Sequence, residues 1–390
     1  MGSRLTDPAT KKLAWNPLGM LPSEPGVFAA NFERLFQVEA PLEPDKDNQF
    51  PQVADRVKVD PVNHFYSTIS AHYGKLALSL HYDLRKTLAP RGLVPAVYCC
   101  GYDWRADNTL SATRLSAVVE EARNDCAGEQ AILVAHSMGG IVSRYYCKQL
   151  GGETKVRALF LLGSPTLGSV SAYQYMREGL PFRDKIRRIL NVSAEGSRLF
   201  MRRMQSIYQL LPNYTYCRDV RTSWVTFDRA HTGYRDKIIP GADMQNQALM
   251  FSDNSNSALL YMDLYAGLTG DLQTRSIVRQ HIDRCHGFSS RLTVGGKIYM
   301  HPMTINYFCD DISTPGNMSL AYHGVSVQGE DVVVHSTLSE GPTVGGDQTV
   351  PADSANPALV SSPVHETRRF AGVGADPRKA KKYFPIGKRE

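Results

Sequence analysis

The sequence predicts an α/β fold built on a doubly wound, mostly parallel sheet. Apolar, strand-like runs alternate with amphipathic segments of helical period between residues 69 and 162. One of these runs, residues 131–136, leads directly into a serine with small neighbours and then into another helical segment. Strand-like sequence returns near residue 291, after a long stretch of helical character. Because strands that alternate with helices form parallel sheets with right-handed crossovers, these observations indicate an α/β core interrupted by an insertion.

The first part of the predicted core, residues 1–169, opens with about 60 polar, proline-rich residues that predict surface loops and one helix near 28–36. The segments that follow are either apolar at helical spacing or continuous β-prone runs. They are a helix over 69–88 that stops at Pro90, a strand over 93–100, a helix over 109–126, the strand over 131–136, a helix to about 150 and a strand over 156–162.

Residues 170–290 predict a helical cap at the carboxyl edge of the sheet, because strand and helix stop alternating there. Within the cap, residues 197–211 place apolar side chains on one face and Arg198, Arg202 and Arg203 on the other. A helix with this pattern either lies on a lipid surface or packs against its own domain.

The second part of the predicted core covers residues 291–376 and is followed by a basic tail, residues 377–390. Strand-like sequence within it occupies 291–308, 326–335 and 366–373.

Ser137 stands where a strand meets a helix, in the pattern of a nucleophile that is held in a sharp turn. Its neighbours two positions away, Ala135 and Gly139, are small, as the strain of such a turn requires, although glycine is usual at the position of Ala135. The turn lifts the serine hydroxyl above the sheet and directs the backbone N–H of Met138 at the group that the serine attacks. The other interpretation is a loop that only joins strand to helix.

A nucleophilic serine needs a base, and the base needs a carboxylate to orient it; in this type of fold they follow the serine in the order acid, histidine. Asp347 lies in a glycine-rich turn, where backbone N–H groups can hold its carboxylate or where it merely occupies the surface. His365 is the sole histidine after Asp347 and therefore the candidate base. It lies 18 residues beyond the acid, at the start of the last predicted strand. A base fits more naturally in the loop after that strand.

Composition and charge exclude several classes of function. Lysine and arginine exceed aspartate and glutamate by 44 − 38 = 6, and most of this excess lies in the basic tail, which argues against a nucleic-acid partner. The seven cysteines include no C-x-x-C pair, so we expect reduced, buried thiols and neither a metal nor another cofactor. No membrane-spanning run and no secretory signal are visible, so the default expectation is a cytoplasmic protein. No pattern indicates an oligomeric state.

Five short blocks together resemble the lecithin:cholesterol acyltransferase family. They are Gly-Tyr-Asp-Trp-Arg at 101–105, Ala-His-Ser-Met-Gly-Gly at 135–140, Gly-Ser-Pro-Thr-Leu-Gly-Ser at 163–169, Leu-Pro-Asn at 211–213 and Gly-Asp-Gln-Thr-Val at 346–350. The resemblance implies an α/β-hydrolase fold with a cap, a Ser-Asp-His triad, and acyl-ester chemistry on phospholipids or related lipids. It implies Ser137 as the nucleophile and Asp347 as the acid. Tyr102, Trp104 and Arg105 would join Met138 as oxyanion or substrate-binding residues.

The sequence departs from the family pattern at both ends. Family members usually begin with an apolar strand and a Pro-Gly-x-x-Gly-Ser turn that supplies the second oxyanion donor, whereas residues 1–5 resemble only the end of that turn. The family's catalytic histidine falls near Ala375, and His365 resembles a strand residue. Three hypotheses follow: an acyltransferase or lipase that meets a membrane surface, a catalytically impaired member that binds lipid or protein, and a short-chain carboxylesterase.

Overall fold

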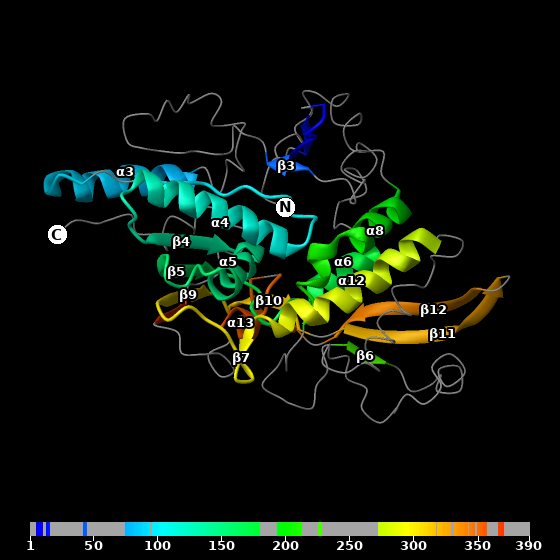
Figure 1. The fold of residues 1–390 in the computed structure, drawn as a ribbon. Helices are drawn as coiled ribbons and strands as arrows, with labels where there is room; N and C mark the ends of the chain where they lie inside the picture. The colour runs from blue at the N-terminus through cyan, green and yellow to red at the C-terminus, as the bar shows by residue number, and fades with distance from the viewer. Residues whose placement is uncertain are drawn as a thin grey trace, which may run out of the picture.

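A four-stranded parallel sheet in the order β14-β9-β5-β4 lies at the centre of the fold (Figure 1). Its strands are β4 (Ala131–His136), β5 (Val156–Leu162), β9 (Thr304–Phe308) and β14 (Glu366–Arg369). The computed structural model describes residues 5–10, 13–15, 42–44, 75–93, 96–179, 193–212, 225–227, 272–316, 318–328, 331–341, 343–347, 349–356 and 366–369. Because the strands are parallel, their carboxyl ends meet at one edge, where sites of α/β folds lie.

Two helices, α4 (Asn108–Asp125) and α5 (Met138–Gln149), cover one face of β4 and β5. Apolar side chains of both helices form a core with Val156 of β5; those from the helices include Leu115, Val119, Ile141, Val142, Tyr145 and Tyr146. On the opposite face of β4, Ile132 and Val134 are 58% and 43% exposed. One buried cluster therefore lies between the sheet and these two helices, and a second contains Leu159, Leu161 and Met300.

The helix predicted over 69–88 is α3 (Lys75–Leu88), with residues 69–74 outside the described residues. It ends at Leu88, before the short 3-10 helix η3 (Ala89–Arg91) that contains Pro90, as predicted.

The strand predicted over 93–100 is wrong for the part that is described, because residues 96–100 form no strand. The apolar run lacks a paired neighbour among the described strands, and β4 is an end strand of the sheet. A strand exists only where a neighbour pairs with its backbone groups.

The cap predicted from the sequence contains four described helices, of which α6, α8 and α12 group together on one side of the sheet (Figure 1). They are α6 (Val170–Glu178), α8 (Ala194–Arg203), α9 (Gln205–Tyr208) and α12 (Leu272–Ser290). A three-residue strand, β6 (Val225–Phe227), lies between α9 and α12 in sequence.

The amphipathic segment 197–211 breaks into α8 and α9 at Met204, whose ψ is 118°. Its apolar face is buried, with Phe200 1% and Tyr208 0% exposed, so the segment packs against the rest of the molecule. Arg202, which we predicted on the solvent face, is also buried, and its Nε donates to the Met176 carbonyl over 2.9 Å. Arg202 lies before the break, within α8, so its burial follows from the packing of α8 against α6, which the helical period alone does not reveal.

The second part of the core contains a long hairpin, β11 (Met318–Gln328) and β12 (Asp331–Glu340), whose first strand also pairs with β6. The strand-like sequence predicted over 326–335 belongs to both strands of this hairpin, because Gln328 pairs with Asp331 and the chain reverses inside that range. Shorter pairs are β7 (Thr293–Val294) with β8 (Lys297–Ile298), and β10 (Ile312–Pro315) with β13 (Thr343–Gly346). The helix α13 (Ala352–Ala355) follows, and β14 coincides with the start of the strand predicted over 366–373.

The described residues near the N-terminus include strands where the sequence predicts surface loops. Three short strands pair as β2-β1-β3: β1 (Leu5–Thr6), β2 (Leu13–Trp15) and β3 (Glu43–Pro44). Leu5 is 0% and Leu42 4% exposed, so this region contributes apolar side chains to the interior. The helix predicted near 28–36 lies outside the described residues.

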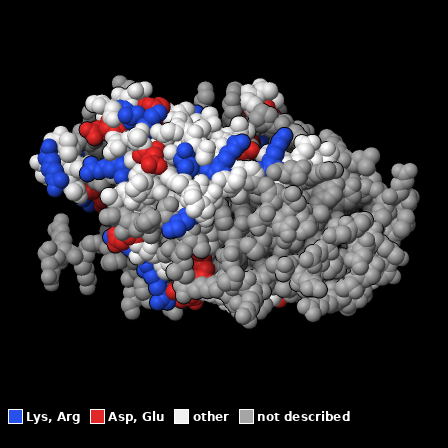
Figure 2. Space-filling view, turned by 60° about the horizontal axis from the view of Figure 1, so that its bottom comes forward, with Lys and Arg blue, Asp and Glu red and all other residues white. Residues whose placement is uncertain are grey.

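Charged side chains of both signs are interspersed on the described part of the face in Figure 2. Some charged side chains of the described residues pair directly; Glu120, for example, lies 2.6 Å from Lys155 and 3.4 Å from Arg123. Among the described helices, none combines the length and the apolar character that crossing a membrane requires.

Candidate active site

Ser137 lies between the last residue of β4 and the first residue of α5, in a backbone conformation that its side chain disfavours. Its φ is 51° and its ψ is −127°, and it is one of two non-glycine residues with positive φ in the described part of the chain. Strain of this kind costs about 1–3 kcal/mol and persists only where the surroundings hold it, which is typical of functional sites. Ser137 is half-buried. The predicted strand, turn and helix therefore form the strained turn.

The two glycines after Ser137 have different surroundings. A Cβ built on Gly139 would meet only the Ala135 Cβ and the Tyr102 hydroxyl, both at 3.9 Å, so alanine at 135 fits the turn. A Cβ built on Gly140 would lie 2.1 Å from the Ser164 Oγ and 2.6 Å from the Ser164 Cβ. Gly140, rather than Gly139, is the position that tolerates no side chain.

The backbone N–H of Met138, the predicted oxyanion donor, is the first N–H of α5. A helix leaves its first N–H groups without helical partners, and its dipole favours negative charge at this end. No described acceptor binds this N–H, so it is free to receive an oxyanion that forms beside Ser137.

Asp347, the predicted acid, directly follows β13, and one of its carboxylate oxygens is fixed by the turn around it. Its Oδ1 accepts the N–H of Thr349 over 3.0 Å and the N–H of Val350 over 2.7 Å. Its Oδ2 lies toward the sheet, 3.0 Å from the position of a Cβ built on Gly163. Within the described residues no donor reaches Oδ2, which leaves this oxygen available to orient a base.

The loop after β5, residues 163–169, adjoins both the predicted nucleophile and the predicted acid. At its start the Ser137 N–H donates to the Leu162 carbonyl over 3.0 Å, and the next residue, Gly163, lies against Asp347. At its end the Ser169 Oγ donates to the Thr349 carbonyl over 2.5 Å, in the turn that holds Asp347. The structure thus brings Ser137 and Asp347 to one loop, although they are distant in sequence.

His365, the predicted base, lies outside the described residues. Three described histidines make hydrogen bonds elsewhere: His281 to the Arg203 carbonyl, His301 to the Glu153 carbonyl and His323 to the Thr337 hydroxyl. His136, next to the nucleophile, is exposed. The described residues therefore do not identify the imidazole of the predicted triad.

Trp104 and Arg105, predicted at the mouth of the site, are buried at 2% and 0% exposure. Arg105 forms a two-point ion pair with Asp103, in which its Nε and Nη2 donate over 2.9 and 2.7 Å. The Ser206 hydroxyl of α9 donates to the Trp104 carbonyl over 2.6 Å, and Phe200 of α8 packs edge-on against the indole. The indole of Trp104 and the backbone carbonyls of Trp104 and Arg105 therefore contact α8 and α9. Tyr102 is half-buried, with its hydroxyl beside Gly139.

Thiols are poor candidates for the nucleophile. Burial raises the pKa of Cys99 to about 11 and the pKa values of Cys147 and Cys285 to about 12. Burial, followed by a hydrogen bond to Asp311, raises the pKa of Cys309 to about 11. These thiols stay protonated near neutral pH, and the thiolate is the reactive form. All six cysteines within the described residues are free.

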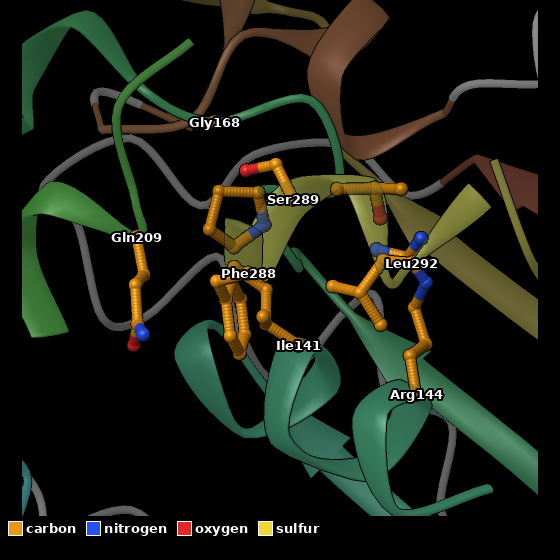
Figure 3. Close-up of a pocket in the computed structure, with 9 residues that line it drawn as sticks. Ile141, Arg144, Gly168, Gln209, Phe288, Ser289 and Leu292 are labelled. Atoms are coloured by element: carbon orange, nitrogen blue, oxygen red, sulfur yellow. The ribbon is translucent and has the colours of Figure 1, made fainter. Parts of the chain in front are cut away.

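A separate small pocket lies between α5, the 163–169 loop and the end of α12 (Figure 3). In Figure 3 the side chains of Ile141 and Arg144 extend from α5 toward Phe288 and Leu292. Arg144 is buried, and its Nε donates to the Tyr299 carbonyl over 2.9 Å. Neither Ser137 nor Asp347 lines this pocket, so it is distinct from the predicted catalytic residues.

The family model for lecithin:cholesterol acyltransferase matches residues 41–273, more than half of the chain. The chain belongs to this family. The match includes the turn at Ser137 and the 163–169 loop, whereas Asp347 and His365 lie beyond it. Lecithin:cholesterol acyltransferase family membership confirms the resemblance that the five sequence blocks indicate.

Two individual proteins illustrate how far the likeness extends. A phospholipid–sterol O-acyltransferase of Arabidopsis thaliana is 30% identical over 174 residues, which are 40% of this chain and 26% of that protein. The matched region thus spans about a quarter of this family relative. The crystal structure of a Tle4-Tli4 complex contains a chain with a TM-score of 0.60 and 19% identity, over 95% of this chain and 89% of that one. This similarity supports the α/β-hydrolase fold.

Three contacts of the site are not evident in the sequence: Ser164 against Gly140, Gly163 against Asp347, and Ser169 on the Thr349 carbonyl. The family motif at 163–169 marks the loop as adjoining the nucleophile. The sequence does not show which serines of this loop form hydrogen bonds, or with which groups. These contacts follow from the register of β4, β5 and β9.

We predict that alanine is tolerated at Gly139 and destabilising at Gly140. At Gly140 the new methyl group overlaps the Ser164 side chain, and overpacking of this kind costs about 1–3 kcal/mol. Gly139 lies one residue earlier in the same helical turn and serves as the matched control. Urea denaturation of both variants measures the difference in free energy of unfolding. Equal midpoints for the two variants would show that Ser164 does not occupy the space beside Gly140.

We also predict that Arg105 is required for folding. Arg105→Leu leaves the Asp103 carboxylate, which is 11% exposed, without its charged partner and with only backbone N–H donors, and breaking a buried pair costs about 3–5 kcal/mol. Arg198→Leu is the control, because Arg198 pairs with Glu195 at the surface with its side chain 37% exposed. Thermal denaturation should show a large drop in midpoint for the first variant and little change for the second. A stable Arg105→Leu protein with weakened substrate binding would instead support the substrate-binding role.

Proposed function

We propose that this chain is a serine acyltransferase or lipase that acts on lipid acyl esters, with Ser137 as the nucleophile. The observation that carries the proposal is the strained backbone of Ser137, held above the carboxyl edge of a parallel sheet. Family membership supports acyl-ester chemistry, and the phospholipid–sterol O-acyltransferase similarity supports a lipid substrate. The cap over residues 170–290 and the core on either side of it are the domains that we propose.

In the proposed reaction the Ser137 Oγ attacks the ester carbonyl carbon while an imidazole accepts the hydroxyl proton. The Met138 N–H receives the oxyanion, and Asp347 Oδ2 orients the imidazole. When the intermediate collapses, the carbon–oxygen bond to the alcohol breaks, the imidazole returns its proton to the alcohol, and the acyl group stays on Ser137. Water or a second hydroxyl then releases it. His365 is the proposed base, because it is the sole histidine after the acid in the chain.

Two alternatives remain as measurable outcomes. A catalytically impaired member that binds lipid or protein would keep the fold and lose the chemistry at Ser137. A short-chain carboxylesterase would keep the chemistry and lose the preference for long acyl chains. A peripheral contact with a membrane surface is part of the lipase proposal.

We predict that a fluorophosphonate probe labels Ser137 and that Ser137→Ala abolishes the labelling. Asp347→Asn should slow the labelling at least about a hundredfold, because the base loses the carboxylate that orients it. Asp353→Asn, six residues away in α13, is the matched control and should label at the wild-type rate. Mass spectrometry of the labelled peptides gives the site and the rate. The absence of labelling between about pH 6 and pH 9 would favour the impaired member.

Substrate class is tested by p-nitrophenyl esters of increasing acyl length. The lipase proposal predicts that kcat/KM rises with chain length, because each buried methylene adds about 0.8 kcal/mol of transfer free energy. A decline beyond the shortest chains would identify the short-chain carboxylesterase instead.

A further inference from the structure

Ser164 is a fully buried serine that contacts the turn containing the nucleophile. It lies two residues beyond the end of β5, and its exposure is 0%. Its Oγ donates to the backbone carbonyl of Ser137 over 3.0 Å. We propose that Ser164 is a positioning residue that fixes the main chain of Ser137 in its reactive conformation, an inference that rests on the proposed role of Ser137.

The strain at Ser137 explains why such a residue is needed. A residue with a φ of 51° and a ψ of −127° relaxes unless both of its peptide groups are held. On the amino side, the Ser137 N–H donates to the Leu162 carbonyl over 3.0 Å. On the carboxyl side, the Ser137 carbonyl accepts the Gly140 N–H over 3.0 Å and the Ser164 hydroxyl over 3.0 Å. The bond from Ser164 is the link between this carbonyl and the neighbouring strand's loop.

The fit between Ser164 and Gly140 shows that the hydroxyl is built into the turn. A Cβ on Gly140 would come within 2.1 Å of the Ser164 Oγ, so the hydroxyl occupies nearly the place that a side chain at 140 would take. Glycine at 140 leaves room for Ser164 to reach the Ser137 carbonyl. Two residues that are 24 positions apart thus form one complementary contact.

Because the two positions nearly coincide, a pair of variants can separate the effect of the hydrogen bond from the effect of packing. In the double variant Gly140→Ala/Ser164→Gly, the new methyl group refills the volume of the lost hydroxyl but donates no hydrogen bond. Ser164→Ala removes the donor and keeps the Cβ. Ser143→Ala is the matched control, because Ser143 is a buried serine of α5, 4% exposed.

The experiment measures two properties of the whole chain in each variant. The first is the rate constant of Ser137 phosphonylation at saturating fluorophosphonate, together with the probe concentration at half-saturation. The second is amide hydrogen exchange in the peptide that contains residues 133–141, which reports on the turn whether or not the protein reacts. We expect Ser164→Ala and the double variant to phosphonylate about tenfold more slowly, because small displacements of a nucleophile are costly. Half-saturation should be unchanged, and exchange in the turn should be about tenfold faster than in Ser143→Ala.

A wild-type phosphonylation rate in Ser164→Ala, or its recovery in the double variant, would overturn the proposal and leave Ser164 as a packing residue. Unchanged hydrogen exchange in the turn would overturn it as well. If Ser164→Ala does not fold, the double variant alone decides, since its new methyl group refills the volume of the lost hydroxyl and only the terminal Cδ2 of Leu161, 2.9 Å from the built Cβ, has to shift. Failure of the wild-type protein to react contradicts the proposed function, and hydrogen exchange then still tests the role of Ser164.

Discussion

The unfavourable backbone conformation of Ser137 is the constraint on which the rest of the site depends. A positive φ at a serine is maintained only when strand, helix and loop leave it no relaxed alternative. Here β4 ends one residue before it, α5 begins one residue after it, and the carbonyl of Leu162 holds its N–H. The same arrangement makes the first N–H of α5 available to an oxyanion. The arrangement that holds Ser137 in its strained conformation is therefore the same one that would place an oxyanion donor beside it.

The loop after β5 extends this constraint to the acid and the cap. Gly163 adjoins the Asp347 carboxylate, and Ser169 binds the turn that contains Asp347. Gly168 has a φ of +92°, and a Cβ there would lie 2.5 Å from the carbonyl of Leu211 at the end of α9. One short segment thus contacts the nucleophile turn, the acid turn and the cap. A change in this loop is expected to affect all three together.

The cap is also fixed to the core through Asp107, which caps the N-terminus of α4. Its carboxylate accepts the side-chain amides of Gln205 and Gln209 over 2.6 and 2.8 Å, and Gln209 in turn accepts the N–H of Asn108. Together with Trp104 and Arg105, these contacts place the family motif at 101–105 in the junction between cap and core. Within this motif, Trp104 contacts Ser206 of α9 and Phe200 of α8.

The sequence predicted the elements whose pattern is local. The strand into Ser137, the helices on either side of it and the end of α3 before Pro90 follow from periodicity and turn chemistry. Local sequence does not show which segments pair as strands over long distances. The run 93–100 is apolar enough for a strand but has no paired neighbour among the described strands. The helical period places Arg202 opposite the apolar face of its segment, and the packing of α8 against α6 buries it. Leu5 and Leu42 lie in polar, proline-rich sequence and are buried only because three short strands meet.

In the proposed reaction Ser137 carries the acyl group between two alcohols, or between an alcohol and water. This intermediate is tested by the intact mass of the protein after rapid acid quenching with a long-chain p-nitrophenyl ester, followed by peptide mapping. We expect a mass increase equal to one acyl group, located on the peptide that contains Ser137 and absent from Ser137→Ala. Ester turnover with the acyl group on another residue, or turnover that persists in Ser137→Ala, would contradict it.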